Sequence, residues 1–189
     1  MTLFSESIVV AGVALDLLRP ESPEALIDED EFAVDEFLPY WAELWPAARV
    51  LAEALPDVRG LRVVELGCGL GLPSLVAAAR GADVTATDWA RDAIELLREN
   101  ARRNGLPLTA EVRDWREPWA ERFDLAVAAD VLYERRNVEP VLERLLELAS
   151  SSLVALAGRP YEDAFLTLAE ASGKRVEHVG KLVRLGEER

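Results

Sequence analysis

The sequence contains a single cysteine, a single histidine and only two lysines among its 189 residues. Cys68 therefore has no partner for an internal disulfide, and His178 lies away from every motif, which argues against Ser–His or Cys–His nucleophilic catalysis. Without a Cys/His cluster, we predict no metal site. A charged-then-apolar leader and an apolar run of about 18 residues are also lacking, so we expect a cytoplasmic protein that does not enter a membrane.

Positive charge is scarce as well, because 35 Asp and Glu outnumber 21 Lys and Arg and give a formal net charge of −14. Sequence-independent binding to nucleic acid needs clustered basic residues, so we expect no nucleic acid as a partner. An acidic surface attracts a basic partner, although acidity also serves solubility alone. The length of 189 residues, of which 50% are apolar, suits one full core, so we expect a single domain over residues 1–189. The sequence does not decide the oligomeric state, for which a monomer is the default expectation.

The order of the apolar segments predicts an α/β protein. The first segment, SESIVVAGVALDLLRP, alternates apolar and polar residues around Ala11 and Gly12, which indicates a β-hairpin. An acidic stretch, ESPEALIDEDEFAVDEF, is expected to be a loop that approaches the site, and residues 38–58 have the spacing of a helix. Residues 59–189 form the expected core. Its strands are predicted at 61–66, 83–87, 108–112, 123–128 and 152–157, and its helices at 73–80, 90–104, 138–149 and 161–172.

This alternation predicts a Rossmann-like, doubly wound and mostly parallel seven-stranded sheet with helices on both faces. The tail GKRVEHVGKLVRL adds two short strands split by Gly180, which suits an antiparallel pair at the sheet edge. In such sheets the ligand lies at the carboxyl ends of the strands, where the strand order reverses.

The segment VVELGCGLG places glycines at 67, 69 and 71 directly after the first core strand. A dinucleotide fingerprint, G-x-G-x-x-G, would have its last glycine at the position of Leu72. Glu65 also brings negative charge to the place where a pyrophosphate would lie. The loop therefore favours a cationic ligand and disfavours an NAD-linked oxidoreductase.

S-adenosylmethionine carries a sulfonium and an ammonium group but no phosphate, and it meets this requirement. Asp88 ends the second core strand, 21 residues after Gly67, and its carboxylate can accept both ribose hydroxyls. Asp114 and Trp115 end the third core strand, where a carboxylate and an indole can meet the amine and the face of adenine. The alternative is purely structural: a tight glycine turn beside solvated strand ends.

At these residues the sequence resembles the class I, seven-β-strand methyltransferases that use S-adenosylmethionine, with VVELGCGLG as the first motif and ATDW as the second. It is more narrowly similar to the protein-lysine methyltransferases that act on the electron-transfer flavoprotein β-subunit and on Hsp70-type chaperones. Four patterns carry that similarity: PYWAELWPAARVLAEAL, VRDWREPW, AADVLYE and GRPYED. The resemblance covers residues 38–172.

The resemblance implies a role for each matching residue. Trp45 would pack near the cofactor, Glu65 would face its methionine ammonium, and Asp88 would hold the ribose. Arg159 and Tyr161 would form the substrate-side rim, with Glu134 nearby. The full set of predicted cofactor-binding residues is Trp45, Glu65, Gly67, Cys68, Gly69, Gly71, Asp88, Trp89, Asp114, Trp115 and Ala129.

Asp130 and Tyr133 form the predicted catalytic pair, because the resemblance places them at the opening through which the acceptor nitrogen reaches the methyl group. A lysine amine has a pKa of about 10.4 in water, so it must lose a proton before attack. Asp130 can receive the ammonium by a charge-assisted hydrogen bond, and Tyr133 can shape the channel or bind the same amine. The alternative for this pair is a loop carboxylate and a core ring.

The function that follows is methyl transfer from S-adenosylmethionine to a lysine side chain of a protein, with a basic protein as the expected partner. Two alternatives stay open: a small-molecule N-methyltransferase, and a cofactor-binding protein without turnover. The fold itself does not decide between them, because one fold hosts many acceptors.

Overall fold

The computed structural model describes residues 2–22 and 39–186. The acidic stretch at 21–37, which the sequence predicts to be a loop, lies outside the described residues apart from Glu21 and Ser22. Within the described ranges, no helix is long and apolar enough to cross a membrane.

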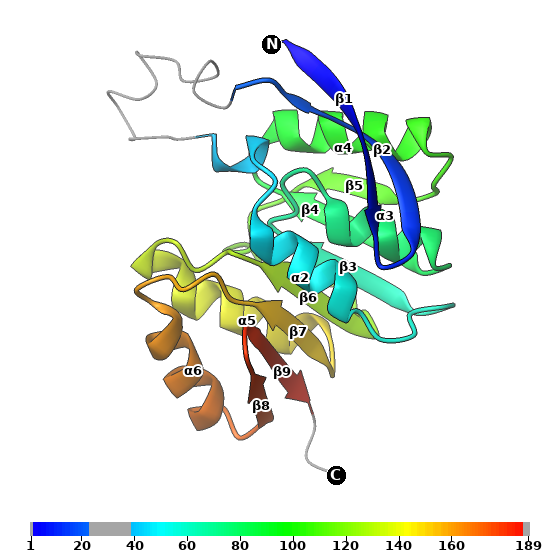
Figure 1. The fold of residues 1–189 in the computed structure, drawn as a ribbon. Helices are drawn as coiled ribbons and strands as arrows, with labels where there is room; N and C mark the ends of the chain where they lie inside the picture. The colour runs from blue at the N-terminus through cyan, green and yellow to red at the C-terminus, as the bar shows by residue number, and fades with distance from the viewer. Residues whose placement is uncertain (1, 23–38, 187–189) are drawn as a thin grey trace.

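A seven-stranded sheet forms the centre of the protein (Figure 1). Its strands are β3 (Arg62–Leu66), β4 (Asp83–Asp88), β5 (Thr109–Val112), β6 (Leu125–Ala129), β7 (Ser152–Ala155), β8 (Arg175–Val179) and β9 (Leu182–Gly186), in the order β5-β4-β3-β6-β7-β9-β8. The pairs from β5 to β7 are parallel, whereas β9 runs antiparallel to both β7 and β8. The predicted fold class, including its antiparallel C-terminal edge, is confirmed.

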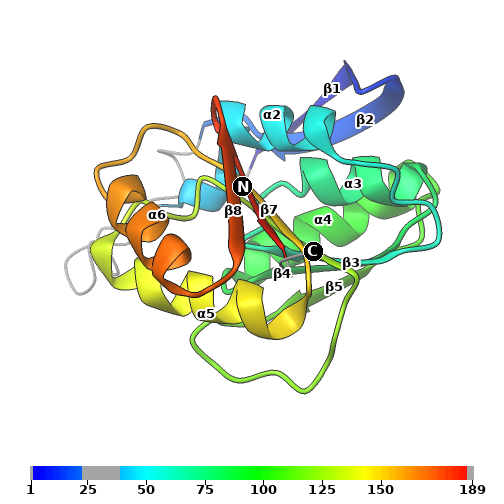
Figure 2. The same ribbon diagram turned by 90° about the horizontal axis from the view of Figure 1, so that it is seen from below.

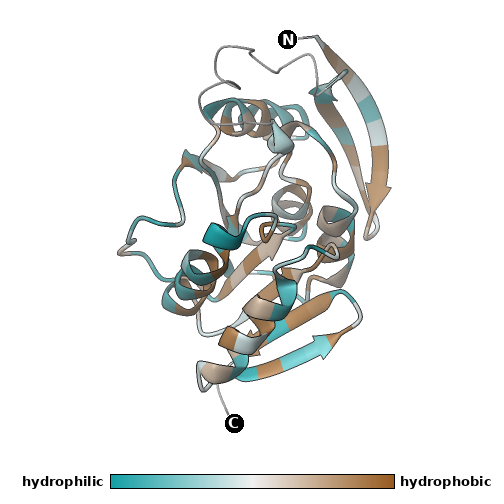
Figure 3. Cartoon of the chain, turned by 90° about the vertical axis from the view of Figure 1, so that its left-hand side faces the viewer, coloured by the Kyte–Doolittle hydropathy of each residue, from teal (hydrophilic) through white to brown (hydrophobic). Residues whose placement is uncertain are grey.

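Helices cover both faces of this sheet, with α2 (Pro46–Ala54) and α3 (Leu72–Ala79) on one side and α5 (Val138–Leu148) and α6 (Glu162–Ala171) on the other (Figure 2). The helix α4 (Arg91–Arg103) packs with α2 and α3 in one cluster of buried apolar residues, called here the first core cluster, which includes Leu51, Leu72 and Leu97. Neighbouring strand residues point to opposite faces, so Val63 joins that cluster while Val64 joins the cluster of α5 and α6. Strands β6 and β7 are accordingly apolar and buried along nearly their whole length, and hydrophobic strand segments run through the middle of the protein (Figure 3).

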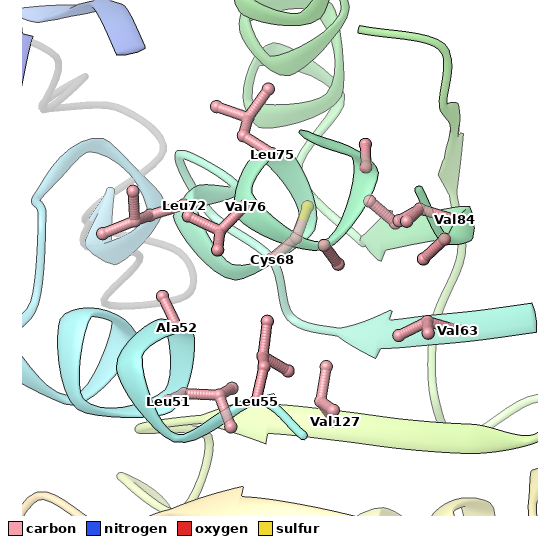
Figure 4. Packing of buried hydrophobic residues seen from close by; sticks show 14 of the residues in the cluster. Leu51, Ala52, Leu55, Val63, Cys68, Leu72, Leu75, Val76, Val84 and Val127 are labelled. Carbon is pink, nitrogen blue, oxygen red and sulfur yellow. The ribbon is translucent and has the colours of Figure 1, made fainter. Parts of the chain in front are cut away.

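The first core cluster holds α2 and α3 against the sheet beside the glycine loop (Figure 4). Leu51 of α2 and Leu72 of α3 are fully buried there, together with Val127 of β6. Leu72 occupies the position where a dinucleotide fingerprint would require glycine, and it serves as a core residue. Burial of a leucine side chain stabilises the fold by about 1.5–3 kcal/mol.

The N-terminal hairpin is confirmed as β1 (Leu3–Val10) and β2 (Val13–Pro20), joined at Ala11 and Gly12, which both have positive φ. The hairpin lies beside α4 (Figure 1), and two asparagine amides, one in α4 and one directly after it, attach β2 to the core. Asn100 exchanges hydrogen bonds with the backbone of Leu18, and Asn104 binds the N–H and C=O of Asp16. The two amides therefore pair with the backbone N–H and C=O groups of β2, as the backbone of a neighbouring strand would.

The helix expected over residues 38–58 is shorter than the sequence suggests. A 3-10 turn at Tyr40–Ala42 is followed by extended backbone at Glu43 and Trp45, and α2 covers only Pro46–Ala54. Pro46 disfavours helical backbone at the residue before it and lacks the N–H that a helix interior needs, so it begins a helix instead of continuing one. The break turns the segment 39–45 into a wall of the site.

Candidate active site

A cavity opens at the carboxyl ends of β3, β4 and β6, where the strand order reverses between β3 and β6. This is the ligand position expected of a doubly wound sheet. The lining residues come from the segment after the hairpin, the glycine loop and four strand ends. They are Tyr40, Trp41, Glu43, Leu44, Trp45, Ala48, Glu65, Gly67, Cys68, Gly69, Leu70, Gly71, Leu72, Asp88, Trp89, Trp115, Ala129, Asp130, Val131, Tyr133 and Arg159.

The glycine loop needs glycine for two physical reasons. Gly67 and Gly71 have φ angles of +64° and +71°, which other residues adopt only at a cost. A Cβ at Gly67 would lie 2.8 Å from the Trp115 ring, and one at Gly71 would lie 2.4 Å from Leu97 of α4. The loop therefore lets its backbone approach the cavity while α3 and α4 stay in contact behind it.

Asp88 at the end of β4 supports that loop. The residue is 5% exposed, and its carboxylate accepts hydrogen bonds from the backbone N–H of Gly69 and of Ala90, each at 2.9 Å. Burial raises the pKa of Asp88, and these backbone donors counteract the rise. Asp88 lines the cavity, as the sequence argument expects, and it also braces the loop, which that argument did not anticipate.

Glu65 lies in β3 with only 1% of its surface exposed. Its Oε2 accepts hydrogen bonds from the backbone N–H of Ser74 at 2.9 Å and from the Ser74 hydroxyl. Burial raises the pKa of Glu65 from 4.5 to about 8, against the lowering effect of the Ser74 donors, and the charge of Asp88 adds to the rise. The site therefore holds two buried carboxyl groups, and neither forms an ion pair with a described residue.

The raised pKa of Glu65 predicts a pH dependence of stability. A carboxyl group that titrates higher in the folded state stabilises the fold below its unfolded pKa of 4.5, and this stabilisation is lost as the pH rises through about 8. We expect the unfolding free energy of the ligand-free protein, relative to Glu65→Gln, to fall from about pH 5 to about pH 9. Chemical denaturation of both proteins across this range tests it, and a difference that stays constant would contradict the buried, protonated state.

The two residues predicted at the end of β5 take different positions. Trp115 is 7% exposed and lines the cavity beneath Gly67, where the buried Arg144 donates to its carbonyl oxygen at 3.0 Å. Asp114 does not line the cavity, because its carboxylate turns to Arg116, whose Nε lies 2.9 Å from both oxygens. The indole is therefore available to a ligand, whereas the carboxylate is paired outside the cavity.

Asp130 directly follows β6 and has a left-handed backbone with φ of +55°. Its N–H donates to the carbonyl oxygen of Ala155 at 3.0 Å, which fixes it against the end of β7. The carboxylate is held by Arg159 through two hydrogen bonds, from Nε at 2.7 Å and from Nη2 at 2.8 Å. A left-handed aspartate in an ion pair at a cavity wall is the kind of constrained geometry that functional sites retain.

Aromatic rings complete the wall around this pair. The Trp45 ring lies 5.1 Å from the Arg159 guanidinium carbon, and its Nε1 donates to the carbonyl oxygen of Tyr40 at 2.8 Å. The rings of Tyr40 and Tyr133 are 5.1 Å apart. Burial raises the pKa of Tyr133 to about 12, so its phenol is neutral at physiological pH.

Most of the sequence-predicted site residues share this cavity, and three do not. Glu134 pairs with Arg136, and Tyr161 precedes α6 and contacts the second core cluster, so these two join Asp114 outside the lining. Tyr40 and Glu43 line the cavity but were not predicted as site residues. The sequence marks Pro46 as a point where a helix can restart, but it does not show that the residues before Pro46 face the cavity.

The fold defines the protein as one with class I methyltransferase architecture. It superposes on a Thermus thermophilus 16S rRNA N2 G1207 methyltransferase with a TM-score of 0.72 and 20% identity, covering 99% of this chain and 51% of that one. Magnesium protoporphyrin IX methyltransferase from Synechocystis, solved with bound S-adenosylmethionine, gives a TM-score of 0.65 and 18% identity, covering 87% of this chain and 99% of that one. Likeness at this identity concerns the fold alone.

Residues 41–171 match the lysine methyltransferase family, and the chain belongs to this family. Among its relatives is the protein N-lysine methyltransferase METTL21A of Mus musculus, 37% identical over 146 residues, which covers 68% of this chain and 66% of that protein. The chain spans 58–66% of the length of the METTL21A proteins that it matches. The family resemblance stated from the sequence motifs is confirmed.

Proposed function

We propose that the protein is an S-adenosylmethionine-dependent N-methyltransferase that modifies a lysine side chain of another protein. The observation that carries this proposal is the cavity itself, in which Asp130 at the end of β6 faces the same space as the glycine loop after β3. Methyl transfer requires that the group that binds the acceptor amine and the loop that binds the cofactor face the same space, because the two reactants must meet in line. Family membership and the names of the relatives support the same activity.

The lining residues fit the proposed cofactor. Glu65 and Asp88 are buried carboxyl groups without a cationic side chain beside them in the described residues, which suits a ligand that brings its own ammonium and hydroxyl donors. The Gly67 backbone lies close against Trp115, leaving an indole to stack on adenine. When bound, S-adenosylmethionine supplies an electrophilic methyl group on a sulfonium.

The protein itself positions the acceptor amine and excludes water from the reacting groups. Asp130 accepts a hydrogen bond from the acceptor amine and orients its lone pair, while the proton leaves to water. Tyr133, neutral and mostly buried, narrows the opening and offers its hydroxyl to the same nitrogen. Alignment and water exclusion of this kind account for much of the rate in such transfers.

The proposed acceptor is a basic protein. Several relatives carry names that specify protein lysines, including EEF1A lysine methyltransferase 3 of Mus musculus. The formal net charge of −14 supports a basic partner, since complementary charge accelerates encounter. A cytoplasmic location and a monomeric state remain part of the proposal.

The test is incubation of the enzyme with methyl-labelled S-adenosylmethionine and an extract of its source cells. We expect label in one or a few protein bands, located on lysine by mass spectrometry, and absent with Asp130→Asn.

The initial rate of protein labelling should fall as salt is raised, because exposed charges more than about 10 Å apart are largely screened at 0.1 M ionic strength. Label confined to small molecules would refute the protein acceptor and favour the alternative of a small-molecule N-methyltransferase.

A further inference from the structure

The cavity contains one cationic side chain among its described lining residues, Arg159. This side chain pairs with Asp130, the residue proposed to bind the acceptor amine. The Arg159 guanidinium binds both carboxylate oxygens of Asp130 and lies 5.1 Å from the Trp45 ring. A carboxylate beside an indole face is also the environment that an alkylammonium group requires. The resident guanidinium and an incoming lysine would therefore use the same two partners.

The two members of the ion pair differ in their freedom to move. The Asp130 side chain is 4% exposed and its backbone is hydrogen-bonded to β7, whereas the Arg159 side chain is 31% exposed. Arg159 follows Gly158 in the loop after β7, and that loop is held through Glu162, which accepts from the N–H of Ala157 and of Gly158. The arginine can swing toward solvent without disturbing these bonds, while the aspartate cannot follow.

Departure of the guanidinium alone would leave Asp130 buried and unpaired, which is strongly unfavourable. Exchange with a second cation avoids that cost. We propose that Arg159 occupies the acceptor subsite in the ligand-free protein and that an acceptor lysine enters by displacing it, an inference that rests on the proposed function. Arg159 is then an internal competitor that keeps the site closed to other cations.

This competitor discriminates between acceptors. A tethered guanidinium has an effective concentration of about millimolar or higher, so a free alkylamine displaces it poorly. A lysine in a folded protein brings further contacts with the rim of the cavity, and these supply the missing free energy. The arrangement therefore selects lysine side chains of proteins over small amines.

The test uses n-butylammonium chloride, which carries the charged end of a lysine side chain, added to protein saturated with S-adenosylhomocysteine at constant ionic strength. Arg159→Met should bind this probe about tenfold more tightly or better, since the apparent dissociation constant is the intrinsic one divided by the vacant fraction. Arg175→Met removes the same charge from an exposed pair on β8 and should bind as the unmodified protein does. The double variant Arg159→Met with Asp130→Asn should lose the gain.

Unchanged or weaker probe binding by Arg159→Met would overturn the proposal and make Arg159 a brace for Asp130. The unmodified protein provides a second measurement that does not depend on a variant that folds. The ¹⁵N resonance of the Arg159 Nε–H should move to the position of a solvated arginine as the probe saturates, and a resonance that stays in place while the probe binds would refute displacement. Failure of S-adenosylhomocysteine to bind would count against the proposed function instead, and the probe titrations without it would still report on Arg159.

Discussion

Asp130→Asn should lower turnover by about 10²-fold or more while cofactor affinity stays within a few-fold. The substitution keeps the shape of the side chain, and asparagine is among the few residues that readily adopt the left-handed backbone found at this position, where φ is +55°. What it removes is the negative charge that receives the acceptor amine. Rates of label transfer under limiting enzyme, together with calorimetric titration of S-adenosylhomocysteine, separate the two effects.

The Asp130–Arg159 pair requires a further control. Loss of the carboxylate leaves the Arg159 guanidinium uncompensated at the cavity wall, where it could repel a cationic ligand. The double variant Asp130→Asn with Arg159→Met removes that cation, and recovery of turnover would show that repulsion caused the loss. Asp163→Asn, an equal charge change at an exposed position of α6, should leave turnover unaltered. Near-normal turnover of Asp130→Asn on the labelled acceptor would end its assignment as the acceptor ligand.

The sheet was predictable because its physical determinants are local in sequence. Strands β3 and β6 are short apolar runs whose neighbouring residues, such as Val63 and Val64, enter opposite cores, and only a sheet covered on both faces buries such a run. The glycine spacing and Leu72 were equally informative. Gly71, directly before α3, has a left-handed backbone that glycine adopts readily, and the next residue is fully buried in the core.

The arrangement of side chains within the site was less predictable, because it depends on contacts between distant segments. Asp130 and Arg159 are 29 residues apart and meet only because β6 and β7 are neighbours in the sheet. The family resemblance implied that Arg159 lies at the substrate-side rim and that Asp130 binds the acceptor amine. No spacing in the sequence predicts that these two residues form an ion pair. The rings of Tyr40, in the 3-10 turn before α2, and Tyr133, after β6, likewise come from segments far apart in the sequence.

Asp114 illustrates a different limit. Its place after β5 suggested a contact with the adenine amine, and the structure turns its carboxylate to Arg116, two residues away. Carboxylates after a strand have local competitors, here a guanidinium and the N–H of the same residue at 2.8 Å. Position at a strand end is therefore insufficient to assign a ligand contact, whereas Asp88 both ends a strand and lines the cavity.

Asp88→Ala should produce the second large effect, on two measurements at once. Its carboxylate accepts from the N–H groups of Gly69 and Ala90 in a site that is 5% exposed, so the alanine variant leaves both donors without their partner. Each unsatisfied buried donor costs about 1–3 kcal/mol, so we expect the ligand-free protein to lose at least that much unfolding free energy. Urea denaturation of the ligand-free variant measures this part.

The same substitution should weaken binding of S-adenosylhomocysteine by about 1–3 kcal/mol, which corresponds to roughly 5-fold to more than 100-fold in dissociation constant. Asp88→Asn should fall between the unmodified protein and Asp88→Ala, because the amide oxygen replaces one acceptor while the amide nitrogen opposes the second N–H donor. Asp83→Ala, at the exposed opposite end of β4, should shift either quantity by no more than about 0.5 kcal/mol. A destabilised Asp88→Ala protein with unchanged affinity would confine Asp88 to bracing the glycine loop and remove it from the ribose subsite.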